Sequence, residues 1–311
     1  MNASIHVSRI IRELNVPSHP LAEVFGFPYD NHSERAERYR NQTLCPYHNK
    51  VPSCTKNSVT NPLGVCSVFE AGRPVITCPT RFREDWRILE DAASFFFSPG
   101  TRYTAVPETR LDDAEGQSAG NIDFVLVAFD EHGQIADFGA LEVQSVYISG
   151  NVSEPFRQYM ATRPNHDFVW SGVVRPDYLS SSRKRLVPQI IYKGGILREW
   201  KKKTAVVVQR AFFESLPQLP VVAKDEADIA WLIYDLVPDG RTNLYHLIQD
   251  EVVYTNSEAV LPRLTTARAG DIGKFLGRIQ QKIEGEGQGH APVTLTPFVE
   301  PETQQSQSWA N

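Results

Sequence analysis

The chain has 311 residues, a formal net charge of −5 and 41% hydrophobic residues, which are ordinary values for a globular protein. No apolar run approaches the roughly 20 residues that a membrane span needs, so we expect no membrane partner. The amino terminus lacks the basic and apolar regions of a secretory signal, which makes the cytoplasm the expected compartment.

The first hundred residues contain two helical patterns separated by an irregular stretch. Apolar residues at helical spacing predict a helix over 4–15, and Ser33 is a suitable N-cap for a short charged helix over 33–41. From Cys45 to Cys78, proline and glycine punctuate the chain, which predicts an irregular segment. Helical spacing returns over 83–97.

After residue 100 the pattern changes to short runs rich in β-branched and aromatic residues, which predict strands. These runs cover 102–111, 121–129, 135–148, 168–174, 188–192, 204–209 and 229–236. Residues 130–134 predict a hairpin turn in which Gly133 adopts positive φ. Helices are expected over 154–161, 209–215 and 271–283. The mixture of strands and helices favours an α/β fold.

The same patterns suggest three regions. Residues 1–82 would form a helical and cysteine-bearing region, and residues 83–285 the main domain. After Gly285 the chain is rich in Gly, Gln, Pro and Ser and poor in large apolar residues. We therefore expect a disordered tail over 286–311.

All four cysteines lie within one segment, with eight, eleven and eleven residues between successive members: Cys45, Cys54, Cys66 and Cys78. Clustered thiols in a segment with little apolar surface indicate a structural metal site, since a thiolate shell can organise such a chain. The spacing lacks the short pairs typical of zinc knuckles and iron–sulfur clusters, so it leaves zinc and iron open. Disulfides are the alternative, disfavoured in a reducing compartment. His48 could replace one thiol.

A second cluster consists of basic residues. Eight lie in one stretch that contains a single acidic residue, Glu199: Arg183, Lys184, Arg185, Lys193, Arg198, Lys201, Lys202 and Lys203. A locally basic face is compatible with nucleic acid, although a solvated charged surface is the ordinary alternative.

Acidic residues on the predicted hairpin indicate a catalytic site. Asp123 lies in the hydrophobic strand 121–129, and Glu142 and Gln144 lie in the next strand. Side chains alternate along a strand, so Glu142 and Gln144 share a face, and antiparallel pairing can bring Asp123 beside them. Two converging carboxylates suit Mg²⁺. A solvent-facing Asp and Glu on an amphipathic hairpin is the alternative explanation.

These motifs together resemble the NotI-like family of type II restriction endonucleases. The resemblance rests on the sequence around each cysteine, including Cys78-Pro-Thr-Arg-Phe82, followed by Asn121-Ile-Asp-Phe124 and Leu141-Glu-Val-Gln144. It covers about residues 40–150. It implies a restriction-endonuclease-like core, in which helices flank a mixed central sheet, with an irregular amino-terminal segment whose four cysteines bind a metal.

The resemblance also implies roles for the residues of the hairpin. Asp123 and Glu142 would be ligands of a catalytic Mg²⁺, with the Val143 carbonyl as a third. Gln144 stands where related nucleases carry a lysine, and it would orient the attacking water by hydrogen bonding. Because Gln cannot accept a proton at neutral pH, that task would fall to the metal-bound water or to a substrate phosphate.

Two further expectations follow from the resemblance. Glu108 matches an additional acidic active-site residue, and Glu90 is a weaker alternative. The four cysteines would hold one structural iron ion without sulfide, although zinc could occupy the same site.

The expected activity is Mg²⁺-dependent cleavage of double-stranded DNA at a GC-rich palindrome, leaving 5′-phosphate and 3′-hydroxyl ends, by a homodimer in a bacterial cytoplasm. The residues expected to contact DNA are Arg175, Arg183, Lys184, Arg185, Lys201, Lys202 and Lys203. The first four would lie in loops and could read guanine, and the three lysines would hold phosphates. The alternatives are a less specific repair or mobile-element nuclease and a DNA-binding module without catalysis.

Overall fold

The computed structural model describes residues 20–48, 53–163 and 174–284. The chain divides into two units, Met1–Thr265 and Thr266–Asn311. The helix expected over 4–15, most of the strand expected over 168–174 and the tail expected over 286–311 lie outside the described residues. Within the described ranges, no helix is both long and apolar enough to cross a membrane.

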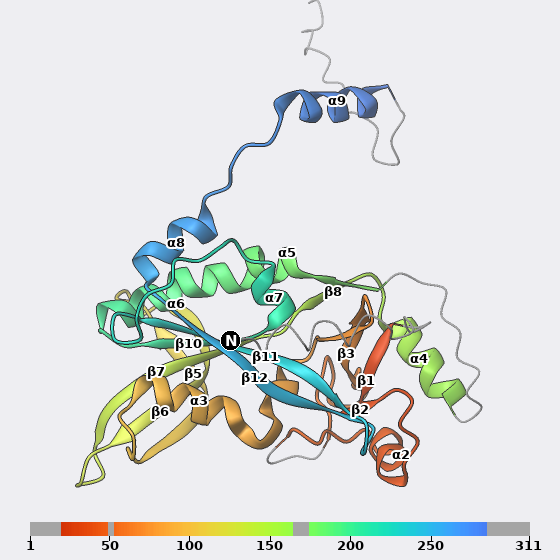
Figure 1. Ribbon diagram of the computed structural model, residues 1–311, viewed down its shortest axis with the longest axis horizontal. Helices are drawn as coiled ribbons and strands as arrows, with labels where there is room; N and C mark the ends of the chain where they lie inside the picture. The colour runs from red at the N-terminus through yellow and green to blue at the C-terminus, as the bar shows by residue number, and fades with distance from the viewer. Residues whose placement is uncertain (1–19, 49–52, 164–173, 285–311) are drawn as a thin grey trace, which may run out of the picture. The chain divides into compact units, whose positions relative to one another are not determined.

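A six-stranded sheet forms the centre of the first unit (Figure 1), with strand order β12-β11-β10-β7-β6-β5. β10 runs parallel to both β7 and β11, whereas the other neighbours pair antiparallel. Its strands are β5 (Tyr103–Asp112), β6 (Ser118–Phe129), β7 (Ile135–Gln144), β10 (Thr204–Gln209), β11 (Ile229–Asp239) and β12 (Leu244–Thr255). The sheet is therefore mixed, and the expected α/β fold is confirmed.

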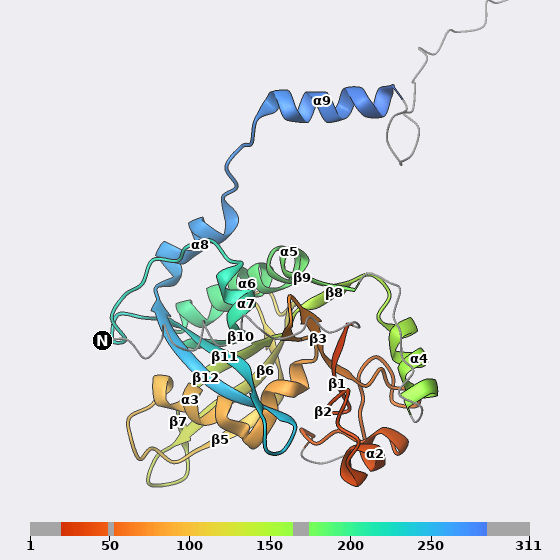
Figure 2. The same cartoon turned by 45° about the vertical axis from the view of Figure 1, so that its right-hand side comes forward.

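Helices cover the two faces of this sheet (Figures 1 and 2), α3 (Arg87–Phe96) on one and α6 (Val187–Glu199), α7 (Arg210–Glu214) and α8 (Ser257–Thr265) on the other. The alternation of side chains along β10 shows this division. Val206 and Val208 pack into the core that contains Ile190 of α6. Val207 packs into the core that contains Ile88 of α3.

A second, four-stranded sheet lies in the amino-terminal part of the chain, with order β2-β1-β3-β4. Its strands are β1 (Leu21–Val24), β2 (Phe27–Pro28), β3 (Val65–Glu70) and β4 (Arg73–Ile76). The prediction of an irregular segment over 45–78 is therefore wrong for β3 and β4. Ala71 and Gly72 both have positive φ, as a tight two-residue hairpin requires. The flanking apolar residues bury against the core and override the breaker residues that mark the segment in the sequence.

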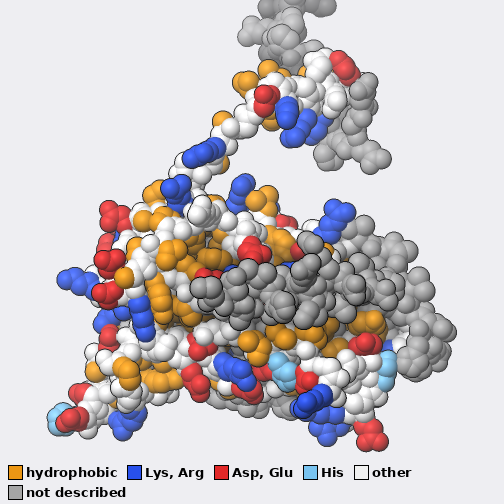
Figure 3. Space-filling view, viewed as in Figure 1, with side chains coloured by type: hydrophobic (Ala, Val, Ile, Leu, Met, Phe, Trp, Pro, Cys, Tyr) orange, Lys and Arg blue, Asp and Glu red, His pale blue; other side chains and the backbone are white. Residues whose placement is uncertain are grey.

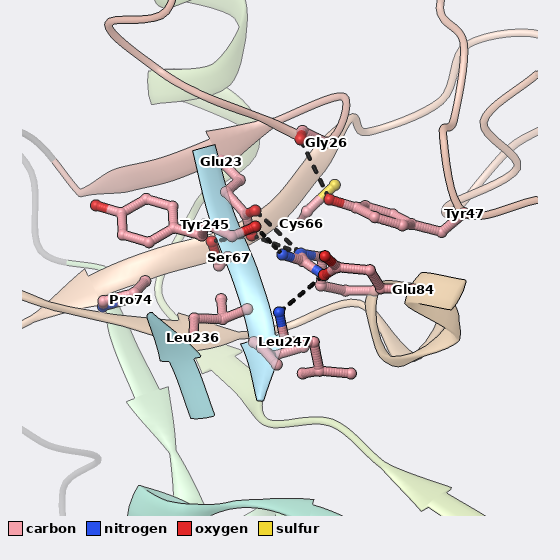
Figure 4. Close-up of polar contacts among 12 residues, drawn as sticks. Glu23, Gly26, Tyr47, Cys66, Ser67, Pro74, Glu84, Leu236, Tyr245 and Leu247 are labelled. Carbon is pink, nitrogen blue, oxygen red and sulfur yellow. Dashed lines mark hydrogen bonds and ion pairs between the residues drawn. The ribbon is translucent and has the colours of Figure 1, made fainter. Parts of the chain in front are cut away.

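Buried Arg81, on the 3₁₀ segment η2 (Pro79–Trp86), joins the small sheet to the large one. Figure 4 labels its partners Glu23, Glu84 and Tyr245. Its guanidinium donates to the Glu23 carboxylate of β1 at 3.0 Å and to Glu84 at 2.6 Å. It also donates to the Tyr245 carbonyl of β12 at 2.8 Å. The Tyr47 ring lies 4.4 Å from the guanidinium carbon, a cation–π contact. The Arg81 and Glu23 side chains are both fully buried, so neither charge is solvated by water and each balances the other.

Hydrogen bonds also join β4 to the ends of the central strands. The Val146 amide, just beyond β7, donates to the Ile76 carbonyl at 3.0 Å. The Gln209 side chain, at the end of β10, accepts from the Ile76 amide and donates to the Pro74 carbonyl, both at 2.7 Å. The cysteine-bearing region and the strand that carries Glu142 are therefore parts of one hydrogen-bonded structure.

Several predicted elements are confirmed. α2 (Glu34–Asn41) begins at Ser33, whose hydroxyl accepts from the Ala36 amide as an N-cap. The hairpin turn over 130–134 is present, with Gly133 at a φ of 76°. The helices α4 (Ser153–Thr162), α7 and α9 (Ile272–Ile283) also agree with the sequence pattern.

Other predictions need correction. The strand expected over 188–192 is wrong, because those residues belong to α6. The run 135–148 is broken after Gln144, and β8 (Tyr147–Ser149) then pairs with β9 (Arg175–Asp177). The helix expected over 83–97 begins only at Arg87, since Glu84 and Asp85 have non-helical backbone angles. Neither β12 nor α8 is predicted by the sequence pattern.

Candidate active site

Asp123 of β6 and Glu142 of β7 lie side by side on the face of the large sheet that α6 covers. The β6–β7 register pairs Phe124 with Leu141, and both of these side chains pack on the α3 side. Alternation then places the next residues, Asp123 and Glu142, on the other face. Asp123 Oδ2 accepts from the Val143 amide at 2.7 Å, and the charge of Asp123 acts on the Glu142 carboxyl.

Burial dominates the electrostatics of this pair. Glu142 is 5% exposed, and burial raises its pKa to about 7, with the Asp123 charge adding to the rise and the Lys193 ammonium opposing it. Burial also raises the pKa of Asp123, against the Val143 amide and the charges of Lys193 and Arg83. The pKa of the buried Glu142 carboxyl and that of the half-buried Asp123 carboxyl are therefore both raised, and the Lys193 ammonium offsets this only in part.

The carboxylate of Glu142 is short of hydrogen-bond donors. Among the described residues, neither of its oxygens has a hydrogen-bond partner, although the Lys193 ammonium lies 2.6 Å from Oε1 as an ion pair. A buried polar atom without a partner is costly unless a ligand satisfies it. The Val143 carbonyl faces the same neighbouring strand as its amide, which Asp123 binds, so it is turned toward the same place. These oxygens fit a hard divalent cation, which commonly takes one or two carboxylates and completes its shell with water and substrate phosphate.

Gln144 and Glu108 lie next to this pair, and Glu90 does not. Gln144 is 7% exposed, shares the face of Glu142, and donates from Nε2 to the Ser145 carbonyl at 2.6 Å. The β5–β6 register places exposed Glu108 opposite Asp123, whose pKa its charge raises. Glu108 has a φ of 50°, a strained conformation of the kind that gathers at functional sites. Glu90 of α3 is exposed, and its charge acts instead on neighbours at that face, Asp91 and Tyr103.

Lys193 is the residue of this site that sequence reasoning missed. The sequence groups it with surface basic residues, whereas the structure buries it on α6 beside Glu142. If 187–199 is taken as a helix, Lys193 falls three residues after Ile190 and four before Leu197, on the buried face. The incorrect strand over 188–192 conceals that spacing.

The four cysteines line a single cavity, together with Tyr47, His48 and Lys56. All four are buried and none forms a disulfide. Burial raises the pKa of Cys45 to about 11 and also raises that of Cys54 and Cys66, with the other thiols adding to each rise.

This cavity has the donors for a metal ion but is not a finished cage. The His48 Nδ1 is buried there without a hydrogen-bond partner among the described residues. In the part of the chain that the structure describes, no three His, Cys, Asp or Glu side chains are arranged to hold a metal. The donor set therefore fits a soft ion in its chemistry, and binding one would require the thiols to close in.

The residues expected to contact DNA fall into two groups. Arg183, Lys184 and Arg185 are exposed, but on a helical π turn, η4 (Ser182–Leu186), and not in the predicted loop. Arg175 is also not in a loop but in β9. Lys202 pairs with Asp137 at 2.5 Å, and Lys203 lies over the Phe95 ring at 4.6 Å. Both thus have partners within the chain, whereas Lys201 is exposed.

The surface shown in Figure 3 carries no single basic field, since Lys and Arg side chains are interspersed with Asp and Glu. On this face, a contact with DNA would therefore depend on particular basic residues and not on the average charge.

The comparison with protein families gives one match. The model of the family described as restriction endonuclease NotI matches residues 30–247, well over half of the chain. No curated protein matches it. The matched segment contains all four cysteines, the acidic pair and Lys193. The chain therefore belongs to the NotI restriction endonuclease family, and it is a type II, site-specific deoxyribonuclease.

Proposed function

We propose that the enzyme hydrolyses DNA phosphodiesters with Mg²⁺ held by Asp123 and Glu142. One observation carries the proposal: the Asp123 and Glu142 carboxyls stand opposite each other on paired strands, and neither oxygen of the buried Glu142 has a hydrogen-bond partner among the described residues. A bound divalent cation supplies Lewis-acid polarisation of the phosphodiester and neutralises charge on the leaving oxygen.

The side chains next to the proposed cation site have separate roles. The Val143 amide fixes one oxygen of Asp123 and leaves the other to face the cation. Gln144, anchored through its amide nitrogen to the Ser145 carbonyl, is left with its side-chain oxygen to accept a hydrogen bond from the attacking water. Because Gln144 cannot take a proton, a phosphate oxygen of the substrate is the base that we propose. Glu108, opposite Asp123, adds a third acidic group at the exposed edge of the site.

For the cysteines, we propose one structural iron ion bound by Cys45, Cys54, Cys66 and Cys78, with zinc able to replace it. Their shared cavity supports this proposal. A complete thiolate shell offers no open position for a phosphate, so the ion would organise the chain and take no part in cleavage.

We further propose that a homodimer acts on a GC-rich palindrome and leaves 5′-phosphate and 3′-hydroxyl ends. A palindromic DNA sequence has two-fold symmetry, so a two-fold symmetric dimer can place one subunit on each half-site. Each subunit then cuts one strand. The exposed arginines Arg175, Arg183 and Arg185 are suited to paired hydrogen bonds with guanine.

Two substitutions test the separate roles of the carboxylates and the thiols. With plasmid DNA and Mg²⁺, the unmodified enzyme should give discrete fragments whose sequenced ends define the site and cut. Glu142→Ala should reduce the cleavage rate by at least about a hundredfold. The variant should still bind DNA in a gel-shift assay. Cys54→Ala should lose bound iron, structure and DNA binding together.

Cleavage that survives in Glu142→Ala under Mg²⁺ would refute the assignment of the carboxylates. A smear of fragments in place of discrete bands would favour the less specific nuclease. Full DNA binding by metal-free Cys54→Ala would refute a structural ion.

A further inference from the structure

Lys193 is a buried ammonium in the middle of the site. It is 4% exposed and lies on the apolar face of α6, between Ile190 and Leu197. A buried lysine is costly unless its charge is matched, and its long side chain has ample freedom to reach solvent elsewhere. Its position therefore depends on what it contacts.

Its two partners belong to the two strands that carry the acidic pair. The Lys193 ammonium donates to the Asn121 carbonyl of β6 at 2.7 Å and lies 2.6 Å from Glu142 Oε1 of β7. Asn121 is two residues before Asp123 along β6. One cation thus bridges both strands at the place where Asp123 and Glu142 meet.

The contact with Glu142 is an ion pair at 2.6 Å from Oε1, and Oε2 has no hydrogen-bond partner among the described residues. By contrast, the bond from Lys193 to the Asn121 carbonyl satisfies the ammonium independently of Glu142.

We propose that Lys193 is a positioning residue that substitutes for the divalent cation at Glu142 before the metal binds. This inference rests on the proposed function, because it requires Asp123 and Glu142 to be the ligands. The ammonium keeps β6 and β7 in place and limits repulsion between the carboxylates. When the cation arrives, Glu142 exchanges the ammonium for the metal, and Lys193 stays anchored at Asn121.

This arrangement makes Lys193 a competitor of the metal. Without it, the two carboxylates repel each other in the metal-free protein, which is then less stable. The same loss leaves the carboxylates more attractive to a divalent ion, since one neighbouring positive charge is gone. Stability without metal and affinity for metal should therefore change in opposite directions.

The test compares the unmodified protein with Lys193→Met and Lys193→Arg in the absence of DNA. Mg²⁺ affinity is measured by titration calorimetry, and the melting temperature is measured in EDTA and in Mg²⁺. Lys193→Met should melt lower in EDTA, show a larger Mg²⁺-induced rise in melting temperature and bind Mg²⁺ on the order of tenfold more tightly. Lys193→Arg retains the charge and should restore an affinity close to that of the unmodified protein. Lys224→Met is the matched control, because Lys224 is exposed and its hydrogen bond goes to the Ser94 carbonyl, at 2.9 Å, away from the acidic pair.

The double variant Glu142→Gln with Lys193→Met separates charge from packing. If Lys193 offsets the carboxylates, removing the Glu142 charge as well should restore stability in EDTA above that of Lys193→Met and abolish the Mg²⁺ response. Equal or weaker Mg²⁺ binding by Lys193→Met than by the unmodified protein overturns the inference. If the unmodified protein itself neither binds Mg²⁺ nor cleaves with it, the proposed function fails instead.

Discussion

Two buried charge clusters in this protein are built in opposite ways. Around Arg81, beside the small sheet, every charge has a partner: Glu23 and Glu84 accept from the guanidinium, and Tyr245 contributes a carbonyl. Around Glu142, in the large sheet, the Asp123 charge opposes that of Glu142, and neither Glu142 oxygen has a hydrogen-bond partner in the described chain, although the Lys193 ammonium lies 2.6 Å away as an ion pair.

The difference distinguishes a structural cluster from a functional one. Buried charges that satisfy one another hold chain segments together and leave nothing for a ligand to do. Buried charges left incomplete are costly to the fold, and that cost is offset only when something binds. The pKa shifts follow the same division: Arg81 lowers the pKa of Glu84 against burial, whereas burial raises that of Glu142.

The largest expected effect comes from breaking the complete cluster. Arg81→Met should destabilise the protein by about 3–5 kcal/mol, because it leaves the fully buried Glu23 carboxylate unpaired. Denaturant-induced unfolding measures this loss, and added Mg²⁺ should not restore it.

The matched control for that variant is Arg110→Met. Arg110 forms an exposed ion pair with Asp112 at 2.6 Å, and exposed pairs are worth under about 1 kcal/mol. If the two variants lose similar stability, the Arg81 cluster is not the structural joint described above.

The cleavage rate should depend on pH because of the raised pKa of Glu142. Since the pKa of Glu142 is raised to about 7, its carboxylate is protonated below that pH and unavailable to the cation. At limiting Mg²⁺, the cleavage rate should fall by about tenfold per pH unit below 7, and more Mg²⁺ should move the midpoint to lower pH. A pH profile flat from about 5 to 8, the range where such a group titrates, would contradict this assignment.

The stability of the metal-free protein should respond to pH in the opposite sense. A folded-state pKa above the ordinary value of 4.5 stabilises the fold while the group is protonated. That contribution is lost as the pH rises through about 7. The lowered pKa of Glu84 does the reverse, because its contribution is lost as the pH falls.

The smallest expected effect concerns the exposed turn that precedes α6. Lys184→Ala should weaken DNA binding a few-fold for all sequences alike and reduce the slope of log affinity against log salt by about 1, as expected for one lost phosphate contact. Gel-shift titrations at several salt concentrations measure the slope, with Lys224→Ala as the control. An unchanged slope would remove Lys184 from the DNA surface.

The β6–β7 hairpin could be predicted from the sequence because the pattern there is local. Alternation in 121–129 and 139–145, with a glycine turn between, is enough to place Asp123 and Glu142 on one face. The family resemblance indicated a restriction endonuclease, and the family match confirms this. The roles of the individual site residues stay proposals.

Features that depend on distant parts of the chain could not be predicted in this way. The small sheet pairs β1 with β3, and Val65 and Val68 become buried only in that pairing. The proposed role of Lys193 likewise depends on its contacts with Asn121 and Glu142, which form only when α6 packs on the sheet. Such contacts cannot be predicted from the Gly and Pro content or from the local charge of a segment.

The helical run before and through α6 has a mechanical consequence. α5 (Tyr178–Ser181), η4 and α6 follow one another without a break, so exposed Arg185 and buried Lys193 belong to the same run. At about 1.5 Å of rise per residue, the two lie roughly 12 Å apart along the axis. A DNA phosphate bound at the exposed turn, as proposed above, would therefore be linked to the buried ammonium through one continuous helical backbone.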